Sequence, residues 1–139
     1  MLRVLIPVDG SENALRAVKF VIRKAPLYKE PLEIHLLNVQ HSFPGTIRGV
    51  RHQAQEFHHE EGLKALASAR RLLDDAGVKY AHHIGVGDAA EVIAHYVKDT
   101  HVEQLVMSTR GLGSASSLLL GSVATKVIHL IDVPVLLVK

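Results

Sequence analysis

Five short apolar runs alternate with four longer amphipathic segments along the chain, and this alternation constrains the fold more than any other feature. The apolar runs are rich in Val, Ile and Leu and have the length of buried strands, whereas the intervening segments repeat apolar residues at helical spacing. Strands that alternate with helices form a parallel sheet with helices on both faces. The sequence therefore predicts one α/β domain over residues 1–139, a doubly wound sheet of five parallel strands sandwiched by helices.

Turn and capping residues set the expected limits of these elements. Ser11 and Asp88 are placed to cap the first and third helices, the latter with Glu91 three residues on, and Gly77 is placed to end the long second helix. The expected strands cover residues 2–8, 32–39, 78–86, 103–108 and 133–138, and the expected helices cover about 12–25, 51–76, 89–100 and 122–131.

Three candidate binding regions follow the expected strands at their carboxyl ends. They are Asp9, the loop after Val39 and the loop after Ser108. In open parallel sheets, ligands bind beyond the carboxyl ends of the strands, where the strand order reverses. Topology alone therefore brings these regions to one edge of the sheet. An Asp-Gly pair is also an ordinary turn, so Asp9 by itself does not identify a site.

The loop after the fourth strand, within Val106 to Val123, is rich in glycine and serine and leads into the last helix. Helix N-termini carry free N–H groups and partial positive charge, which suits phosphate, and glycine lets the backbone approach an anion closely. The candidate anion-binding residues are Arg110, Gly111, Gly113, Gly121 and Ser122, with Lys126 as a further cation. The loop has neither Walker nor dinucleotide-fold glycine spacing, and its composition would equally suit ordinary turns and caps.

Composition excludes several other classes of function. The 16 basic and 14 acidic residues are interspersed, which argues against nucleic-acid binding, and no apolar run has the length of a membrane span. The absence of cysteine excludes thiol catalysis and agrees with a cytoplasmic location. The ten histidines form no metal-binding motif and no Ser–His pair is specified, so we expect no metal site and no catalytic residue.

The chain resembles the universal stress protein family along its whole length. The resemblance is carried by IPVDGSENALRAV, LLNV, IGVGDAAEVIAHYV and MSTRGLGSASSLLLGSVATKVIHLIDVPVLLVK. Nucleotide-binding members carry Gly-x2-Gly-x9-Gly-Ser/Thr after the fourth strand. Gly111, Gly121 and Ser122 match this pattern, whereas Ser108 stands in place of the first glycine. The resemblance implies a Rossmann-like sheet with strand order 3-2-1-4-5.

The resemblance also implies a ligand and the residues that bind it. ATP would be bound, with Mg²⁺ bridging its phosphates: Asp9 would contact the nucleoside or the metal, the main chain of Val39 the adenine, and Ser108 would lie near the ribose. Gly111, Gly121, Ser122 and Val123 would hold the phosphates. Hydrolysis would be slow, because no general base can be assigned.

Two functions remain open from the sequence. One is a nucleotide-dependent regulatory module of the stress response, and the other is a dimeric interaction protein of the same fold that binds no nucleotide. The last strand, from Val133 to Val138, is short, apolar and expected at a sheet edge, where Pro134 is tolerated. Because family members typically dimerise through this strand, we expect a homodimer.

Overall fold

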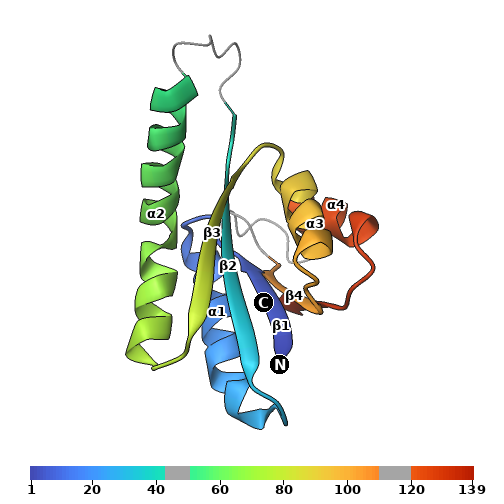
Figure 1. Cartoon of the computed structure of the whole chain (residues 1–139). Coiled ribbons are helices and arrows are strands. Elements are labelled where there is room, and N and C mark those ends of the chain that lie inside the picture. Colours follow the sequence, from blue (N-terminus) through green and yellow to red (C-terminus); the bar gives the residue numbers. More distant parts are fainter. Residues whose placement is uncertain (43–50, 110–119) are drawn as a thin grey trace.

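The computed structural model describes residues 1–42, 51–109 and 120–139. Strands and helices alternate along the chain (Figure 1). The elements are β1 (Leu2–Pro7), α1 (Glu12–Lys24), the 3-10 turn η1 (Ala25–Leu27), β2 (Leu32–Gln40), α2 (Arg51–Asp75), β3 (Tyr80–Val86), α3 (Ala89–Asp99), β4 (Gln104–Ser108), α4 (Ser122–Leu130) and β5 (Val135–Val138). Each predicted strand and helix is present, with bounds that differ by one or two residues at most ends.

The five strands form one parallel sheet in the order β3-β2-β1-β4-β5, as predicted. The order reverses between β1 and β4, so the carboxyl ends of these two strands flank the switch point. The last strand begins at Val135, two residues later than predicted. Pro134 has no N–H to donate, although its carbonyl accepts a hydrogen bond of 2.9 Å from the Leu105 amide.

Helices α1 and α3 begin, and α2 ends, at the predicted capping residues. The Ser11 hydroxyl accepts the Ala14 amide at 3.3 Å, and the Asp88 carboxylate accepts the Glu91 amide at 3.1 Å. Gly77 follows α2 with a φ of +68°, a conformation that suits glycine at a helix C-terminus. These local interactions fix where α1 and α3 start, immediately beyond the carboxyl ends of β1 and β3.

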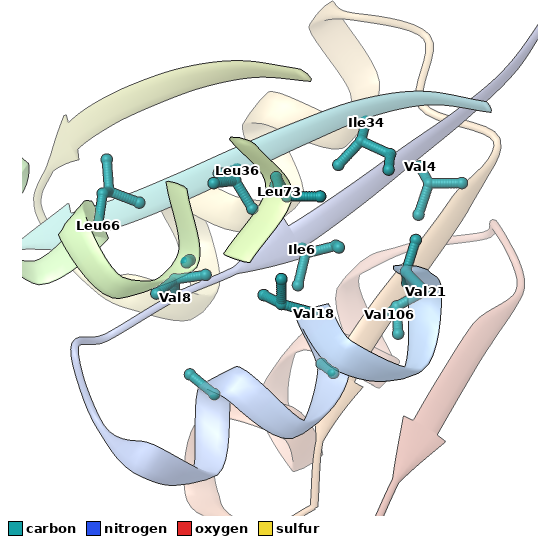
Figure 2. Close-up of a cluster of buried hydrophobic side chains, with 13 residues drawn as sticks. Val4, Ile6, Val8, Val18, Val21, Ile34, Leu36, Leu66, Leu73 and Val106 are labelled. Atoms are coloured by element: carbon teal, nitrogen blue, oxygen red, sulfur yellow. The ribbon is translucent and has the colours of Figure 1, made fainter. Parts of the chain in front are cut away.

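Two hydrophobic cores cover the two faces of the sheet. One packs α1 and α2 on the sheet through residues that include Ile6, Val18, Leu36, Leu66 and Leu73 (Figure 2). The other packs α3 and α4 on the opposite face through residues that include Leu5, Leu37, Ile93, Leu105 and Val127. Both cores are built from aliphatic side chains, as is usual for buried parallel strands. Within the described ranges, no helix is long and apolar enough to cross a membrane.

Candidate functional site

A pocket of about 200 Å³ lies at the carboxyl edge of the sheet, at the switch point. Its walls come from the ends of β1, β2 and β4 and from the N-terminal turns of α1, α3 and α4. The lining residues include Val8, Asp9, Ser11, Leu37, Val39, Ile93, Met107, Ser108, Thr109, Gly121, Ser122 and Val123. The structure therefore brings together the predicted residues Asp9, Val39, Ser108, Gly121, Ser122 and Val123.

Asp9 is fixed at the mouth of the pocket by the turn that leads into α1. Its Oδ1 atom accepts hydrogen bonds from the Ser11 amide at 2.9 Å and the Ser11 hydroxyl at 2.5 Å. Asp9 thus serves the Asp-Gly turn and lines the pocket as well. Among the described residues that line the pocket, it is the only ionisable side chain.

A buried asparagine beneath the pocket holds the ends of β1 and β2 together. Asn38 is 2% exposed; its amide nitrogen donates to the Val8 carbonyl at 2.8 Å, and its Oδ1 accepts from the Gln40 side chain at 2.7 Å. Val8 also donates its amide to the Leu37 carbonyl at 2.8 Å, so the backbone pairing continues past the end of β1. The residue was missed in the sequence, although an asparagine within the apolar run LLNV was a usable signal.

Ser108 lies at the end of β4 and directs its hydroxyl away from solvent. The hydroxyl donates a hydrogen bond to the Asn13 carbonyl in the first turn of α1. The next residue, Thr109, donates its amide to the Val138 carbonyl at 2.9 Å and accepts the Gly121 amide at 3.3 Å. The chain therefore leaves β4 and returns to α4 at almost the same point, and Thr109, which was not predicted, joins the two.

The first turn of α4 opens into the pocket. Gly121 is the N-cap residue and makes no side-chain capping bond, and the first intrahelical bond is donated by the Thr125 amide to the Gly121 carbonyl at 2.9 Å. The preceding amides, of residues 122–124, have no acceptor within the helix, and these residues line the pocket. They form a patch of backbone donors with partial positive charge, which suits an anion.

The remaining predicted residues fall in two groups. Arg110, Gly111 and Gly113 lie outside the described residues. Lys126, which was considered as a further cation, does not line the pocket. Its amino group lies 3.0 Å from the Asp88 carboxylate and 3.7 Å from that of Glu91.

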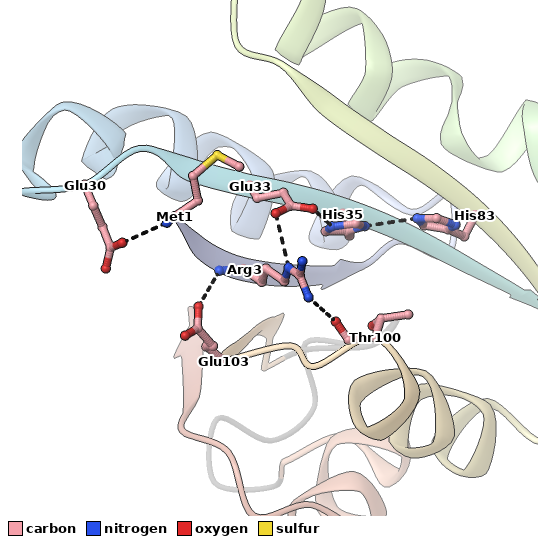
Figure 3. A network of polar contacts seen from close by, with 8 residues as sticks. All are labelled: Met1, Arg3, Glu30, Glu33, His35, His83, Thr100 and Glu103. Carbon is pink, nitrogen blue, oxygen red and sulfur yellow. Dashed lines mark hydrogen bonds and ion pairs between the residues drawn. The ribbon is translucent and has the colours of Figure 1, made fainter.

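A separate polar network crosses the uncovered part of the α3 face (Figure 3). Glu33 accepts from the Arg3 guanidinium at 3.2 Å and lies 3.0 Å from Nε2 of His35, whose Nδ1 lies 3.0 Å from Nε2 of His83. Burial, followed by the charge of His35, lowers the pKa of His83. Burial also raises the pKa of Tyr96, whose ring packs against His83, to about 12. Part of this network is half-buried, and no pattern in the sequence indicated it.

The described part of the chain contains no group of three or more His, Cys, Asp or Glu side chains arranged to hold a metal.

Comparison with known proteins decides the family. The profile of the universal stress protein family matches residues 1–139. This chain belongs to the universal stress protein family. Universal stress protein MJ0531 of Methanocaldococcus jannaschii is 31% identical over 138 residues, which cover 99% of this chain and 81% of that protein.

Solved structures of related proteins have the same fold. The structure of MJ0577 from Methanocaldococcus jannaschii superposes on this universal stress protein with a TM-score of 0.79 and 30% identity, over 99% of this chain and 95% of that one. A universal stress protein family member from Arabidopsis thaliana, solved with AMP bound, has a TM-score of 0.72 and 24% identity. That match covers 100% of this chain and 92% of the other.

Proposed function

We propose that the pocket at the carboxyl edge binds an adenine nucleotide, ATP, and that this universal stress protein is a nucleotide-dependent regulatory module of the stress response. The observation that carries the proposal is the first turn of α4, whose amides of residues 122–124 have no acceptor within the helix and whose residues line a pocket at the switch point of the sheet. A helix N-terminus at this position is the usual place for a phosphate in doubly wound folds.

The walls of the pocket suit the other parts of the ligand. Leu37, Val39 and Ile93 provide apolar surface for a purine, and the main chain of Val39 would meet its edge. Asp9 would contact the ribose or a phosphate-bound Mg²⁺. Because no lysine or arginine lines the pocket among the described residues, the amides of residues 122–124 would carry the contacts to phosphate there.

Known complexes with this fold support an adenine nucleotide. Besides the Arabidopsis thaliana protein with AMP, universal stress proteins of similar fold have been solved with dAMP and with cAMP. We expect slow hydrolysis, because Asp9 is the only titratable side chain among the described lining residues and its Oδ1 already accepts two hydrogen bonds.

Isothermal titration with ATP, ADP and AMP, with and without Mg²⁺, tests the proposal. Gly121→Val should abolish binding, because its side chain would fill the space in front of the α4 amides. The backbone angles of Gly121, φ −57° and ψ 153°, are accessible to valine, so the fold should survive. His129→Val is the matched control, since it adds valine to an exposed position of α4 outside the pocket. Wild-type protein that binds no nucleotide would refute the proposal.

The alternative function, a dimeric interaction protein without nucleotide, is favoured by one observation. β5 lies at the edge of the sheet with its outer side unpaired among the described residues, and Leu137 is 36% exposed there. An apolar edge strand favours pairing with another chain. We therefore propose a symmetric homodimer through Val133 to Val138 under either function. Monomeric mass by static light scattering at micromolar concentration would contradict it.

We also propose a cytoplasmic location, which the absence of cysteine supports and cell fractionation would test.

A further inference from the structure

A charged groove lies at the amino end of β3, away from the pocket at the carboxyl edge. It is lined by Arg70 and Asp74 from the last turns of α2, by Lys79 from the connection that follows, and by Tyr80 and His82 from the start of β3. Figure 1 shows these two segments adjoining at the connection between α2 and β3. Because β3 is an edge strand, nothing in the described sheet covers its outer side.

Arg70 lines this groove and is oriented by one hydrogen bond. Its Nε atom donates to the Tyr80 hydroxyl at 3.4 Å, which orients the guanidinium. Within the described residues Arg70 forms no ion pair, although Asp74 lines the same groove. A guanidinium carries five donors in a planar fork, so most of its donors remain available to a ligand.

His82 adds a titratable imidazole to the groove that Arg70 lines. The charged groups that act on this imidazole are Arg70 and His59 from α2; Tyr80 of the same strand and Lys79, which precedes β3, also line the groove. Burial, then the charges of Arg70 and His59, lower the pKa of His82. Arg70 and Lys79 are cationic, His82 becomes cationic when it is protonated, and the described lining holds a single carboxylate, that of Asp74. An anion bound there would offset the positive charge and favour the protonated imidazole.

We propose that this groove is an oxyanion-binding site, which takes a carboxylate or phosphate group on Arg70, His82 and Lys79. The groove lies at the amino end of β3, whereas the nucleotide pocket lies at the carboxyl ends of the strands, and the two share no lining residue. The oxyanion has two possible sources. One is a free inorganic anion, and the other is an acidic side chain on an extended segment that lies along the outer edge of β3.

NMR titration of the full chain with sulfate at constant ionic strength tests the site. Sulfate keeps its charge over the range in which His82 titrates, so any pH dependence belongs to the protein. The imidazole resonances of His82 should shift and saturate, and binding should tighten as the pH falls, because the anion stabilises the imidazolium. Arg70→Gln should weaken binding about tenfold or more through the loss of charge-assisted hydrogen bonds.

Arg71→Gln is the matched control, since it removes the same charge from the next, exposed residue of α2 outside the groove. It should bind sulfate as the wild type does. Lys79→Gln, a change at an exposed position, provides a second test that does not disturb α2 and should also weaken binding.

The source of the oxyanion is identified by comparing the affinities of three probes. These are inorganic phosphate, a glutamate-rich peptide and a lysine-rich peptide of equal length. Tighter binding of the glutamate-rich peptide than of phosphate assigns the site to an acidic segment, and the reverse assigns it to a free anion. The proposal is overturned if His82 does not respond to any of these anions. It is overturned equally if Arg70→Gln and Arg71→Gln weaken sulfate binding to the same extent.

Discussion

Gly62→Ala should destabilise the protein even though alanine is the better helix former. Gly62 lies in α2, where the helix crosses β3, and a Cβ atom added to it would lie 2.6 Å from Cδ1 of Ile84 and 2.7 Å from both its Cγ atoms. The added Cβ atom would therefore clash with three carbon atoms of the Ile84 side chain at once. Because a β-branched side chain has few χ1 alternatives, it cannot simply rotate aside, and α2 must move from the sheet.

The two opposing effects can be compared in magnitude. Alanine in place of glycine within a helix contributes about 0.8–1 kcal/mol, whereas overpacking of a well-packed contact costs about 1–3 kcal/mol. The steric cost should exceed the gain, since three atoms of Ile84 are approached at once. We expect a net loss of about 1–2 kcal/mol, or a fall in melting temperature of roughly 3–8 °C.

Urea denaturation of Gly62→Ala measures this loss. In an Ile84→Ala background the clash is absent, so the same substitution should become stabilising by about 1 kcal/mol through helix propensity alone. Ser68→Ala, at an exposed position of α2, is a control for propensity and should stabilise slightly. If Gly62→Ala stabilises the protein equally with and without Ile84, the packing argument is wrong.

Three further predictions follow from single contacts. Asn38→Ala leaves the buried Val8 carbonyl without its side-chain donor, so it should lower stability to urea by about 1–3 kcal/mol and weaken ATP binding in calorimetry. His83 has a lowered pKa in the folded protein, so the unfolded chain binds more protons once the pH falls below about 6.5. The free energy of unfolding should therefore decrease from that pH down through the folded pKa. In urea denaturation at successive pH values, His83→Gln should make this decrease less steep. Lys126→Gln breaks an exposed ion pair with Asp88, and should leave both the urea midpoint and ATP affinity nearly unchanged, because Lys126 does not line the pocket.

The features that were predictable from the sequence depend on neighbours in the chain or on a topological rule. Ser11 and Asp88 cap helices through bonds that span three residues, so their roles are visible in the local pattern. The convergence of Asp9, Val39 and Ser108 required only that parallel strands end at one edge of the sheet. Both kinds of inference are independent of how side chains pack.

The features that were missed depend on the register between strands and on helix rotation. His35 meets His83 because β2 and β3 pair with Leu37 opposite His83, which places the two histidines diagonally on one face. The sequence contains both histidines but not this register. Likewise, the rotation of α2 about its axis leaves Ala67 exposed and brings Gly62 against Ile84 of the sheet.

The hydrogen bond of the Ser108 hydroxyl bears on both the fold and the proposed nucleotide binding. In the sequence Ser108 stands in place of the first glycine of the pattern expected for nucleotide binding, and it was expected to lie near the ribose. Its hydroxyl instead donates to the Asn13 carbonyl, so the serine joins β4 to α1, a bond that glycine cannot make. Since the hydroxyl proton is used within the fold, the oxygen can act toward a ligand in the pocket only as an acceptor. The serine therefore weighs less against the proposed nucleotide binding than the sequence suggested, and that binding would depend chiefly on the α4 amides.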